Sequence, residues 1–337
     1  MASNPIILTA SNLNLGYLKG KQVNTIAENL DFALEKGKLT CLLGPNGVGK
    51  STLIKTIMGQ LPPLHGQIYL EGKPIQQYGL REISKKIAIV LTDKIRLGSI
   101  SVRQLVELGR IPHTSWLGKL APEDQNKVDN AIKATNILYL ADRPLTELSD
   151  GQLQKVMIAR ALAQDGEILL LDEPTAHLDL VNRLEIMHLL KSIAREENKA
   201  ILITTHDLEI AIETADEFWL MPCGSPLVSG LPEDLIIQQN LDLLLPSHQL
   251  YFDRDSGKIK RKVEILKINI DGPASIKKWL ELALIKNHIT TLPEDQNLIL
   301  KENPFELIFK DGKNETKFHQ IKALIDFLKK GNAAEKN

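Results

Sequence analysis

The sequence predicts an α/β protein in which buried parallel strands alternate with helices. Three short apolar runs point to this class: LTCLLG at 39–44, ILLLDEP at 168–174 and AILITTHD at 200–207. Runs of this length, without polar interruption, are typical of strands that are buried on both faces of a parallel sheet. Because the carboxyl ends of such strands meet at one edge, we expect the residues that follow them to form a common site.

Length and composition favour two domains and argue against several functions. The chain has 337 residues, 43% of them hydrophobic, which exceeds an average single domain and suffices for packed cores. Its 41 Lys and Arg balance 42 Asp and Glu, so no overall basic field would recruit nucleic acid. Cys41 and Cys223 are far apart without CxxC spacing, which argues against a disulfide framework or a zinc site and fits a reducing compartment.

The sequence also argues against membrane insertion. No stretch approaches the roughly 20 apolar residues that a membrane span needs. The opening segment, MASNPIILTA, lacks the basic residues and the long apolar run of a secretion signal. We therefore expect the chain to stay inside the cell and outside the bilayer.

A glycine-rich loop follows the first apolar run. The segment GPNGVGKST at 44–52 precedes LIKTIMG, whose apolar residues have helical spacing. It fits G-x-x-x-x-G-K-[ST], in which small residues let backbone N–H groups surround phosphate oxygens at a positive helix end. Lys50 would reach the β- and γ-phosphates, and the Ser51 hydroxyl would bind Mg²⁺. The candidate nucleotide-binding residues here are Gly44, Pro45, Asn46, Gly47, Gly49, Lys50, Ser51 and Thr52.

Two carboxylates and a histidine follow the other two apolar runs. Asp172 and Glu173 end the run ILLLDEP, and His206 ends the run AILITTHD. We expect Asp172 to hold Mg²⁺ through water, and Glu173 to be the base that orients or deprotonates the attacking water. His206 would contact the γ-phosphate, so the candidate catalytic residues are Lys50, Glu173 and His206.

Five segments together resemble the motifs of one protein family. GPNGVGKST resembles Walker A, LSDGQ at 148–152 the signature, ILLLDEP Walker B, HLD at 177–179 the D-loop, and the histidine of TTHD the switch histidine. Over about residues 5–245 the chain thus resembles the ATP-binding subunits of ABC transporters. The resemblance implies a P-loop NTPase fold with an N-terminal antiparallel β part and a helical subdomain at about 95–160. It also implies an ATPase that uses ATP and Mg²⁺.

The resemblance gives the signature segment a role at a subunit interface. In this family two subunits pack head to tail, and the signature of one covers the γ-phosphate that Walker A of the other binds. A homodimer with two ATP molecules at its interface is therefore implied, with contacts from Ser149, Gly151, Gln152 and Asp179. The residue types agree, since Ser149 is a good helix cap and Gly151 permits close backbone approach. Asp150 stands where the family usually has glycine, and we expect its side chain to point away from the nucleotide.

Two further positions are carried over from the family pattern. Family members usually have a Gln that contacts Mg²⁺ and the lytic water, at the end of a strand that KIAIVLTDK at 86–94 resembles. Here Thr92 stands in its place, so either a water bridges the gap or Asp93 substitutes. Tyr17, which precedes Walker A, matches the aromatic residue that stacks on adenine in the family.

The helical segment before the signature resembles the part of the family that grips the membrane subunits. Within it, SVRQLVELGRIPHTSWLG at 101–118 is similar to the branch that imports iron–siderophore complexes, haem and vitamin B12. Four residues carry this similarity: Gly109, Arg110, Pro112 and His113. The resemblance implies permease subunits as partners, a substrate-binding protein as an indirect partner, and a cytoplasmic location on the inner face of the cell membrane. From the residues alone, Arg110 would be a solvated cation at a helix end and Trp116 a packing anchor.

The family pattern stops at about residue 245. Within the remaining residues, 246–337, VEILKINI, NLILKE and ELIFKD have the pattern of strands. ASIKKWLELALIKN and ETKFHQIKALIDFLKK have apolar residues at helical spacing. We therefore expect a small α/β module in the order strand, helix, strand, strand, helix. Its role stays open between stabilising the dimer, sensing a metabolite and inhibiting transport, and its interleaved charges favour a solvated surface over a nucleic-acid site.

Two other functions remain open on the sequence. One is the ATPase subunit of an ABC transporter for a different cargo. The other is a soluble ABC ATPase such as the cluster-assembly type, which also has one cassette but no membrane partner. Family members that act in translation usually hold two cassettes, and repair members carry a long coiled coil, whereas this chain shows one Walker A and no heptad insertion.

Overall fold

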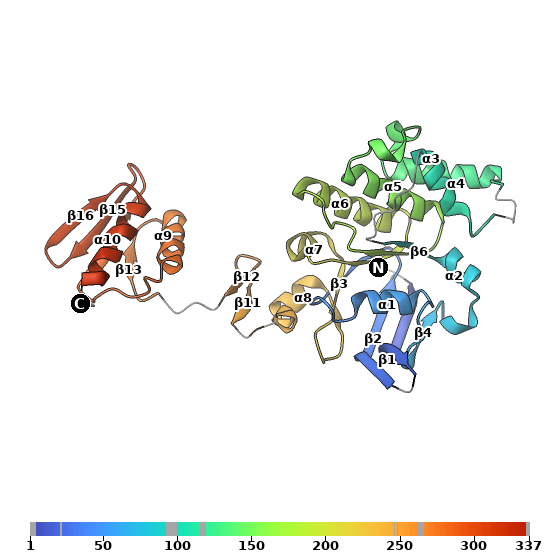
Figure 1. Ribbon diagram of the computed structural model, residues 1–337, viewed down its shortest axis with the longest axis horizontal. Helices are drawn as coiled ribbons and strands as arrows, with labels where there is room; N and C mark the ends of the chain where they lie inside the picture. Colours follow the sequence, from blue (N-terminus) through green and yellow to red (C-terminus); the bar gives the residue numbers. More distant parts are fainter. Residues whose placement is uncertain are drawn as a thin grey trace. The chain divides into compact units, whose positions relative to one another are not determined.

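The computed structural model describes residues 5–20, 22–91, 100–114, 119–245, 247, 249–261 and 266–334. It contains two compact units, Met1–Lys260 and Arg261–Asn337 (Figure 1). The sequence predicts a boundary between residues 245 and 246. The first unit extends further because a β-hairpin after that point places Phe252 in its hydrophobic core.

A sheet of six strands in the described residues forms the centre of the first unit, in the order β10-β9-β3-β8-β7-β6. The strands are β3 (Leu39–Leu43), β6 (Ile87–Val90), β7 (Ile168–Asp172), β8 (Ala200–Thr204), β9 (Glu217–Leu220) and β10 (Val228–Gly230). β6, β7, β8, β3 and β9 run parallel, whereas β10 pairs antiparallel with β9. The predicted parallel strands are therefore confirmed, and β3, β7 and β8 end side by side.

The central strands contribute side chains to two hydrophobic cores, one on each face of the sheet. On β3, Leu39, Cys41 and Leu43 belong to one core and Leu42 belongs to the other. This is why the strands lack the polar alternation of a half-exposed sheet. Burial raises the pKa of the Cys41 thiol, so this cysteine is an unreactive core residue, whereas Cys223 is exposed.

An antiparallel sheet covers one of these cores. Its order is β2-β1-β4-β5, with β1 at Ile6–Lys19, β2 at Gln22–Glu35, β4 at His65–Leu70 and β5 at Lys73–Pro74. Its apolar face meets helix α1 and the central sheet in the core that contains Leu8, Leu30 and Leu53. This sheet is the antiparallel β part that the sequence predicts.

Helices α3 to α8 contribute to the other core, whereas α1 and α2 pack in the core beneath the antiparallel sheet. The helices of the first unit are α1 (Lys50–Ile57), α2 (Leu80–Lys86), α3 (Val102–Glu107), α4 (Pro122–Ala134), α5 (Asp150–Ala163), α6 (Leu180–Glu196), α7 (Leu208–Thr214) and α8 (Pro232–Ile237). Short 3₁₀ helices lie at Ile75–Gln77, Leu108–Arg110, Leu138–Leu140, Leu145–Glu147 and Asn240–Leu244. Helices α3, α4 and α5 pack together through Val102, Val128 and Val156 (Figure 1). No helix in the described ranges is long and apolar enough to cross a membrane.

A two-stranded hairpin ends the first unit. It consists of β11 (Leu250–Asp253) and β12 (Lys258–Arg261). Phe252 on β11 is buried in the same core as Leu235 of α8 and Leu241. The hairpin is thereby attached to the core of the first unit.

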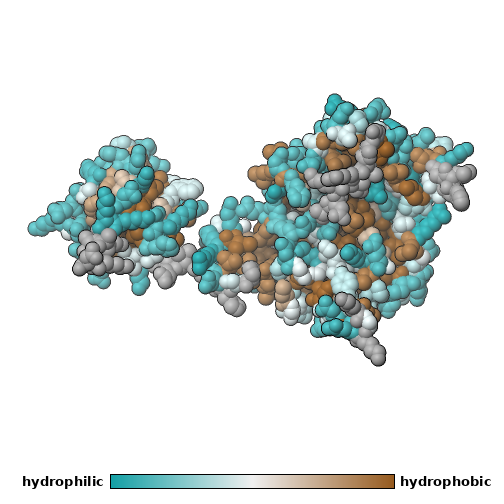
Figure 2. Space-filling view, in the orientation of Figure 1, coloured by the Kyte–Doolittle hydropathy of each residue, from teal (hydrophilic) through white to brown (hydrophobic). Residues whose placement is uncertain are grey.

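The second unit is a small α/β module with its own core. Its strands are β13 (Asn269–Asp271), β14 (Gln296–Lys301), β15 (Glu306–Asp311) and β16 (Asn314–Phe318), and its helices are α9 (Ala274–Lys286) and α10 (Ile321–Ala334). The strands lie in the order β13-β14-β15-β16, with β13 parallel to β14 and the others antiparallel. Leu280 of α9, Leu298 of β14 and Leu324 of α10 share one core. Figure 2 shows a small hydrophobic area on the visible face of this unit, surrounded by hydrophilic residues.

The predicted helix over ETKFHQIKALIDFLKK is wrong in its first part. Residues Asn314–Phe318 form β16, and the helix begins at Ile321. The signal for this hairpin is Asp-Gly at 311–312, because Gly312 adopts a φ of 57° and turns β15 into β16. Cross-strand pairing with β15, including the ion pair of Lys310 and Glu315 at 2.7 Å, outweighs the helical spacing of these residues.

Candidate functional site

The phosphate-type loop connects β3 to α1 and folds around the side chain of Lys50. Lys50 Nζ donates hydrogen bonds to the carbonyl oxygens of Gly44, at 2.8 Å, and Pro45, at 3.1 Å. Burial lowers the pKa of Lys50, and the negative charges of Glu173 and Asp172 oppose this shift. The ammonium group is thus held inside the loop, next to the carboxylates that follow β7.

Gly49 is one of the loop glycines that a larger residue cannot replace. It is the N-cap of α1 with a φ of 114°, and a Cβ atom there would lie 2.6 Å from Ile26 Cγ2. Position 49 therefore needs glycine both for backbone conformation and for space. Because the first N–H groups of a helix lack partners within the helix, the start of α1 suits a phosphate.

Asp172 connects the loop to two strands. Its Oδ2 accepts a hydrogen bond from Ser51 Oγ at 3.2 Å, and its Oδ1 accepts one from Thr204 Oγ1 at 2.6 Å. Thr204 Oγ1 also accepts a hydrogen bond from the Glu173 N–H at 2.9 Å. Sequence reasoning missed Thr204, although it precedes His206 by two residues at the end of β8. Its buried hydroxyl fixes both carboxylate-bearing residues relative to β8.

Glu173 and His206 meet at the open side of this cluster. His206 Nε2 lies 2.5 Å from Glu173 Oε1, and the two side chains are 43% and 33% exposed. Glu173 has a φ of 50°, a conformation that costs a non-glycine residue roughly 1–2 kcal/mol. Strain of this kind is frequent at functional sites.

The signature segment and the D-loop form a second cluster. Ser149 is the N-cap of α5, as the sequence predicts: its Oγ accepts the Gln152 N–H at 3.2 Å, and its own N–H donates to Gln152 Oε1 at 3.0 Å. A Cβ atom on Gly151 would lie 2.4 Å from Asn182 Oδ1, so α6 explains this glycine within one subunit. Asp179 in turn accepts the Asn182 N–H at 2.8 Å, and this hydrogen bond lowers the pKa of Asp179.

Tyr17 lies at the edge of the phosphate-type loop. Its hydroxyl is 3.2 Å from Thr52 Oγ1, and its ring is partly exposed on β1. A partly exposed ring beside the start of α1 is available to a flat ligand group. Thr92, Asp93 and Trp116 lie outside the described residues.

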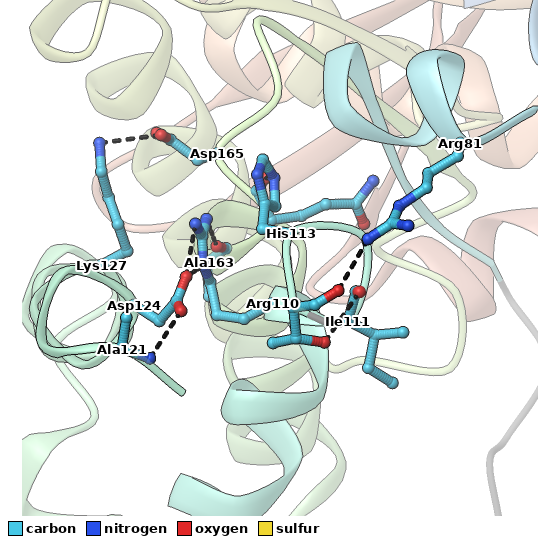
Figure 3. A network of polar contacts seen from close by, with 11 residues as sticks. Arg81, Arg110, Ile111, His113, Ala121, Asp124, Lys127, Ala163 and Asp165 are labelled. Atoms are coloured by element: carbon cyan, nitrogen blue, oxygen red, sulfur yellow. Dashed lines mark hydrogen bonds and ion pairs between the residues drawn. The ribbon is translucent and has the colours of Figure 1, made fainter. Parts of the chain in front are cut away.

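A third cluster surrounds the turn at 108–114, between α3 and α4. Arg110 is buried, 6% exposed, and donates to Asp124 Oδ1 and to the Ala163 carbonyl oxygen, both at 2.8 Å (Figure 3). The interpretation of Arg110 as a solvated cation is therefore wrong, because the end of α5 and the start of α4 enclose it. The Ala121 N–H and then the Arg110 guanidinium hold the pKa of Asp124 below its usual range.

The same turn contacts two further elements. His113 Nε2 lies 2.8 Å from the Gln164 carbonyl oxygen, just after α5. Arg81 of α2, labelled in Figure 3, donates to the carbonyl oxygens of Pro112, at 3.2 Å, and Thr114, at 2.7 Å. The turn thus links α2 to the end of the signature helix. Several large apolar side chains are exposed on the turn and near α2: Leu80, Leu91, Leu108 and Ile111.

Comparisons with known proteins agree with this geometry. The family model described as ABC transporter matches residues 27–176. The iron(3+)-hydroxamate import ATP-binding protein FhuC of Bacillus subtilis is 42% identical over 223 residues, covering 66% of this chain and 81% of FhuC. The ferric enterobactin transport ATP-binding protein FepC of Escherichia coli is 36% identical over 235 residues, covering 70% and 85%.

A solved structure gives the same result for the fold. CbiO1 from Clostridium perfringens, part of the ABC transporter complex cbiONQ, superimposes with a TM-score of 0.62 at 33% identity, covering 71% of this chain and 93% of that one. The chain belongs to the ABC transporter ATP-binding family and has its ATPase fold. Within that family it is similar to the ATP-binding subunits of iron–siderophore importers. Cassettes of this family bind ATP, form dimers and work with membrane permeases.

Proposed function

We propose that this ATPase subunit powers the import of an iron–siderophore complex, haem or cobalamin through a membrane permease. The cluster of Lys50, Ser51, Asp172, Glu173 and His206 carries the ATPase part of the proposal. The similarity to FhuC and FepC supports the iron–siderophore part, since both act on ferric siderophores by name. A different cargo remains the alternative within the same family.

Lys50 binds phosphate in this proposal. Its ammonium group exchanges the carbonyl oxygens of Gly44 and Pro45 for oxygens of the β- and γ-phosphates. The Lys50 ammonium group keeps oxygen partners throughout such an exchange. Its burial therefore does not prevent phosphate binding. The N–H groups at the start of α1 bind the remaining phosphate oxygens.

Ser51 and Asp172 fit a magnesium ion. Their Oγ and Oδ2 atoms lie 3.2 Å apart, and both are hard oxygen donors beside the phosphate site. Mg²⁺ is usually held by one or two protein oxygens together with substrate phosphates and waters, so these two residues suffice. When bound, the ion neutralises charge that develops on the transferred phosphoryl group. Thr92 would be a further oxygen donor.

Glu173 and His206 act on water and on the γ-phosphate. Glu173 accepts a proton from, or orients, the attacking water, and His206 donates a hydrogen bond to the γ-phosphate. Their contact keeps both side chains at the same edge. Binding of ATP would then insert the γ-phosphate and water next to a pair that is already assembled.

The signature and D-loop clusters complete the site of a second subunit. Ser149 and Gly151 lie at the positive end of α5, which suits the γ-phosphate of a partner's ATP. Gln152 and Asp179 support that end from within the same subunit. An isologous homodimer with two ATP molecules follows, and Asp150 is expected to turn away from the triphosphate.

The exposed apolar residues around the turn at 108–114 suit a helix of a permease. Leu108 and Ile111 lie on the turn, which Arg110 and Arg81 hold firmly in place. An amphipathic helix of a partner can lay its apolar face against exposed apolar side chains of this kind. The chain would then act at the inner face of the cell membrane, and a substrate-binding protein would deliver cargo to the permease from the other side.

A capture experiment tests this function. The tagged Glu173→Gln chain is incubated with ATP and Mg²⁺ in a gently solubilised extract of its native cells, and bound proteins are identified by mass spectrometry. We expect a stoichiometric polytopic membrane protein. The matched control is the Glu173→Gln, Lys50→Ala double variant, which should retain less permease because it does not close on ATP.

Two results would change the assignment. Recovery of soluble partners alone, from a fully extracted membrane fraction, favours the cluster-assembly alternative. Recovery of a permease whose deletion leaves uptake of ferric siderophores, haem and cobalamin unchanged would assign the chain to another cargo. Uptake of each labelled compound by cells that carry Glu173→Gln measures this directly.

A further inference from the structure

The hairpin of β11 and β12 lies beside the loop that carries His206. Two cavities meet at this loop, one of about 580 Å³ and one of about 140 Å³. Glu173 and Lys258 line the larger cavity, and Pro45 and Phe252 line the smaller one. His206 and Ile259 line both. The second strand of the hairpin is therefore the wall that faces the candidate hydrolysis site.

The hairpin is firmly attached to the first unit. Phe252 is buried in the main core, and its N–H donates to Asp242 Oδ1 at 2.7 Å. Lys260 and Ser256 both contact the Asp253 carboxylate, and the contact with Lys260 lowers the pKa of Asp253. The Phe252 contacts attach β11 to the core, and the contacts of Lys260 and Ser256 with Asp253 join β12 to β11.

The His206 loop is held by a hydrogen bond within its own turn and by a contact with α6. The Asp207 N–H donates to Thr205 Oγ1 at 3.0 Å, and Arg183 lies 3.3 Å from Asp207 Oδ2. On the other side it faces β12, where Lys258 Nζ lies 3.2 Å from Glu209 Oε1 in the first turn of α7. Both members of this ion pair are well exposed, so it is a weak restraint.

Ile259 is the stronger part of this wall. It lines both cavities, together with Thr205, His206 and Leu208. The Ile259 side chain is 50% exposed, and its covered part faces the rest of the first unit. Truncation of Ile259 would enlarge the space beside His206 and give the imidazole ring room to leave Glu173.

We propose that Ile259, assisted by Lys258, is a positioning residue for His206. Neither side chain is assigned a contact with the reacting atoms; the hairpin limits how far the His206 ring can move away from Glu173 and from the proposed γ-phosphate position. The inference rests on the role proposed for His206 in hydrolysis. Because a small displacement of a reacting group lowers the rate of the chemical step more than it lowers affinity, the effect should appear in kcat.

Steady-state ATPase kinetics of the full-length chain test this proposal. For Ile259→Ala we expect kcat to fall about ten-fold while the KM for ATP changes less than about two-fold. Ile259→Val should keep kcat within about two-fold of the parent, because the branched side chain still fills the gap. Lys258→Ala should lower kcat by less than about three-fold, in line with its exposure.

Controls separate this proposal from the role of His206 itself. Ile6→Ala truncates an isoleucine of similar exposure on β1 that lines neither cavity, and should leave kcat unchanged. Rates are expressed per nucleotide-binding site, counted by equilibrium titration with a fluorescent ATP analogue, so misfolded protein does not count. If His206→Ala is inactive while Ile259→Ala turns over at the parent rate, the positioning role is wrong. If His206→Ala itself keeps the parent rate, the proposed function of His206 fails first.

Discussion

The candidate hydrolysis site and the turn at 108–114 use similar pairs of side chains in opposite surroundings. Arg110 and Asp124 are buried in the turn and satisfied by neighbouring carbonyl and N–H groups. Glu173 and His206 also contact each other, but both are partly exposed and face a cavity of about 580 Å³. A charged pair enclosed by its own chain is a structural element, whereas a pair that faces a cavity is available to a ligand.

The backbone conformations at the candidate hydrolysis site and at the turn also differ. Glu173 adopts a positive φ without being glycine, which is a cost that neighbouring contacts such as the Thr204 hydrogen bond offset. Gly109, beside Arg110, is instead required by close packing, since a Cβ atom there would lie 2.2 Å from the Arg160 carbonyl oxygen. The candidate hydrolysis site thus has a strained backbone at Glu173, whereas the turn at 108–114 is packed so closely that only glycine fits at position 109.

The largest effect is expected from Glu173→Gln. The amide cannot act as a base, so kcat should fall roughly 10²–10⁴-fold while ATP affinity is retained. The free energy of unfolding should change by less than about 1 kcal/mol, because the side chain is partly exposed. Phosphate release and urea unfolding measure the two quantities. Hydrolysis at the parent rate would assign the base to another residue.

The next effect is on stability, from Arg110→Met. This change leaves Asp124 buried without its cation and should lower the free energy of unfolding by about 3–5 kcal/mol. Tryptophan fluorescence in a Trp279→Phe background reports unfolding of the first unit, because Trp219 is buried there. The Arg110→Met, Asp124→Leu double variant should recover most of the loss. A fall in kcat per nucleotide-binding site, without loss of stability, would place the turn in the catalytic machinery instead.

A smaller effect is expected from Lys127→Ala, which serves as a control within the same cluster. Lys127 lies 2.9 Å from Asp165 (Figure 3), but both side chains are well exposed. Water screens such a pair, so the loss of stability should be below about 1 kcal/mol. If Lys127→Ala and Arg110→Met destabilise the first unit equally, burial is not what distinguishes the two ion pairs.

The smallest effect is a change in pH dependence from His113. Burial, and then the charge of Arg110, lower the pKa of His113 below the usual 6.5. The unfolded chain therefore binds a proton at a pH where the folded chain does not, and stability decreases as the pH falls below 6.5. His113→Gln should reduce this slope in urea unfolding between about pH 7 and about pH 5. An unchanged slope would show that His113 titrates alike in both states.

Local sequence patterns predicted the secondary structure around the phosphate-type loop, but not the distant residues that pack against the site. The strand, glycine loop and helix around Lys50 follow from spacing alone, because glycine positions and apolar runs constrain the backbone directly. The hydroxyl of Thr204 and the wall formed by Ile259 have no local signal, since each acts through residues that are distant along the chain. The strand Asn314–Phe318 was missed because its apolar spacing also suits a helix.

The sequence by itself determined the fold class, the family and the residues of the phosphate, carboxylate and signature motifs. Only the tertiary structure decided that Arg110 is enclosed, that Thr204 ties Asp172 to Glu173, and that a hairpin beyond residue 245 borders His206. Motifs are local because phosphate binding needs consecutive N–H groups on one loop. Burial and cavity walls depend on which distant segments meet, and that is settled by packing of the whole unit.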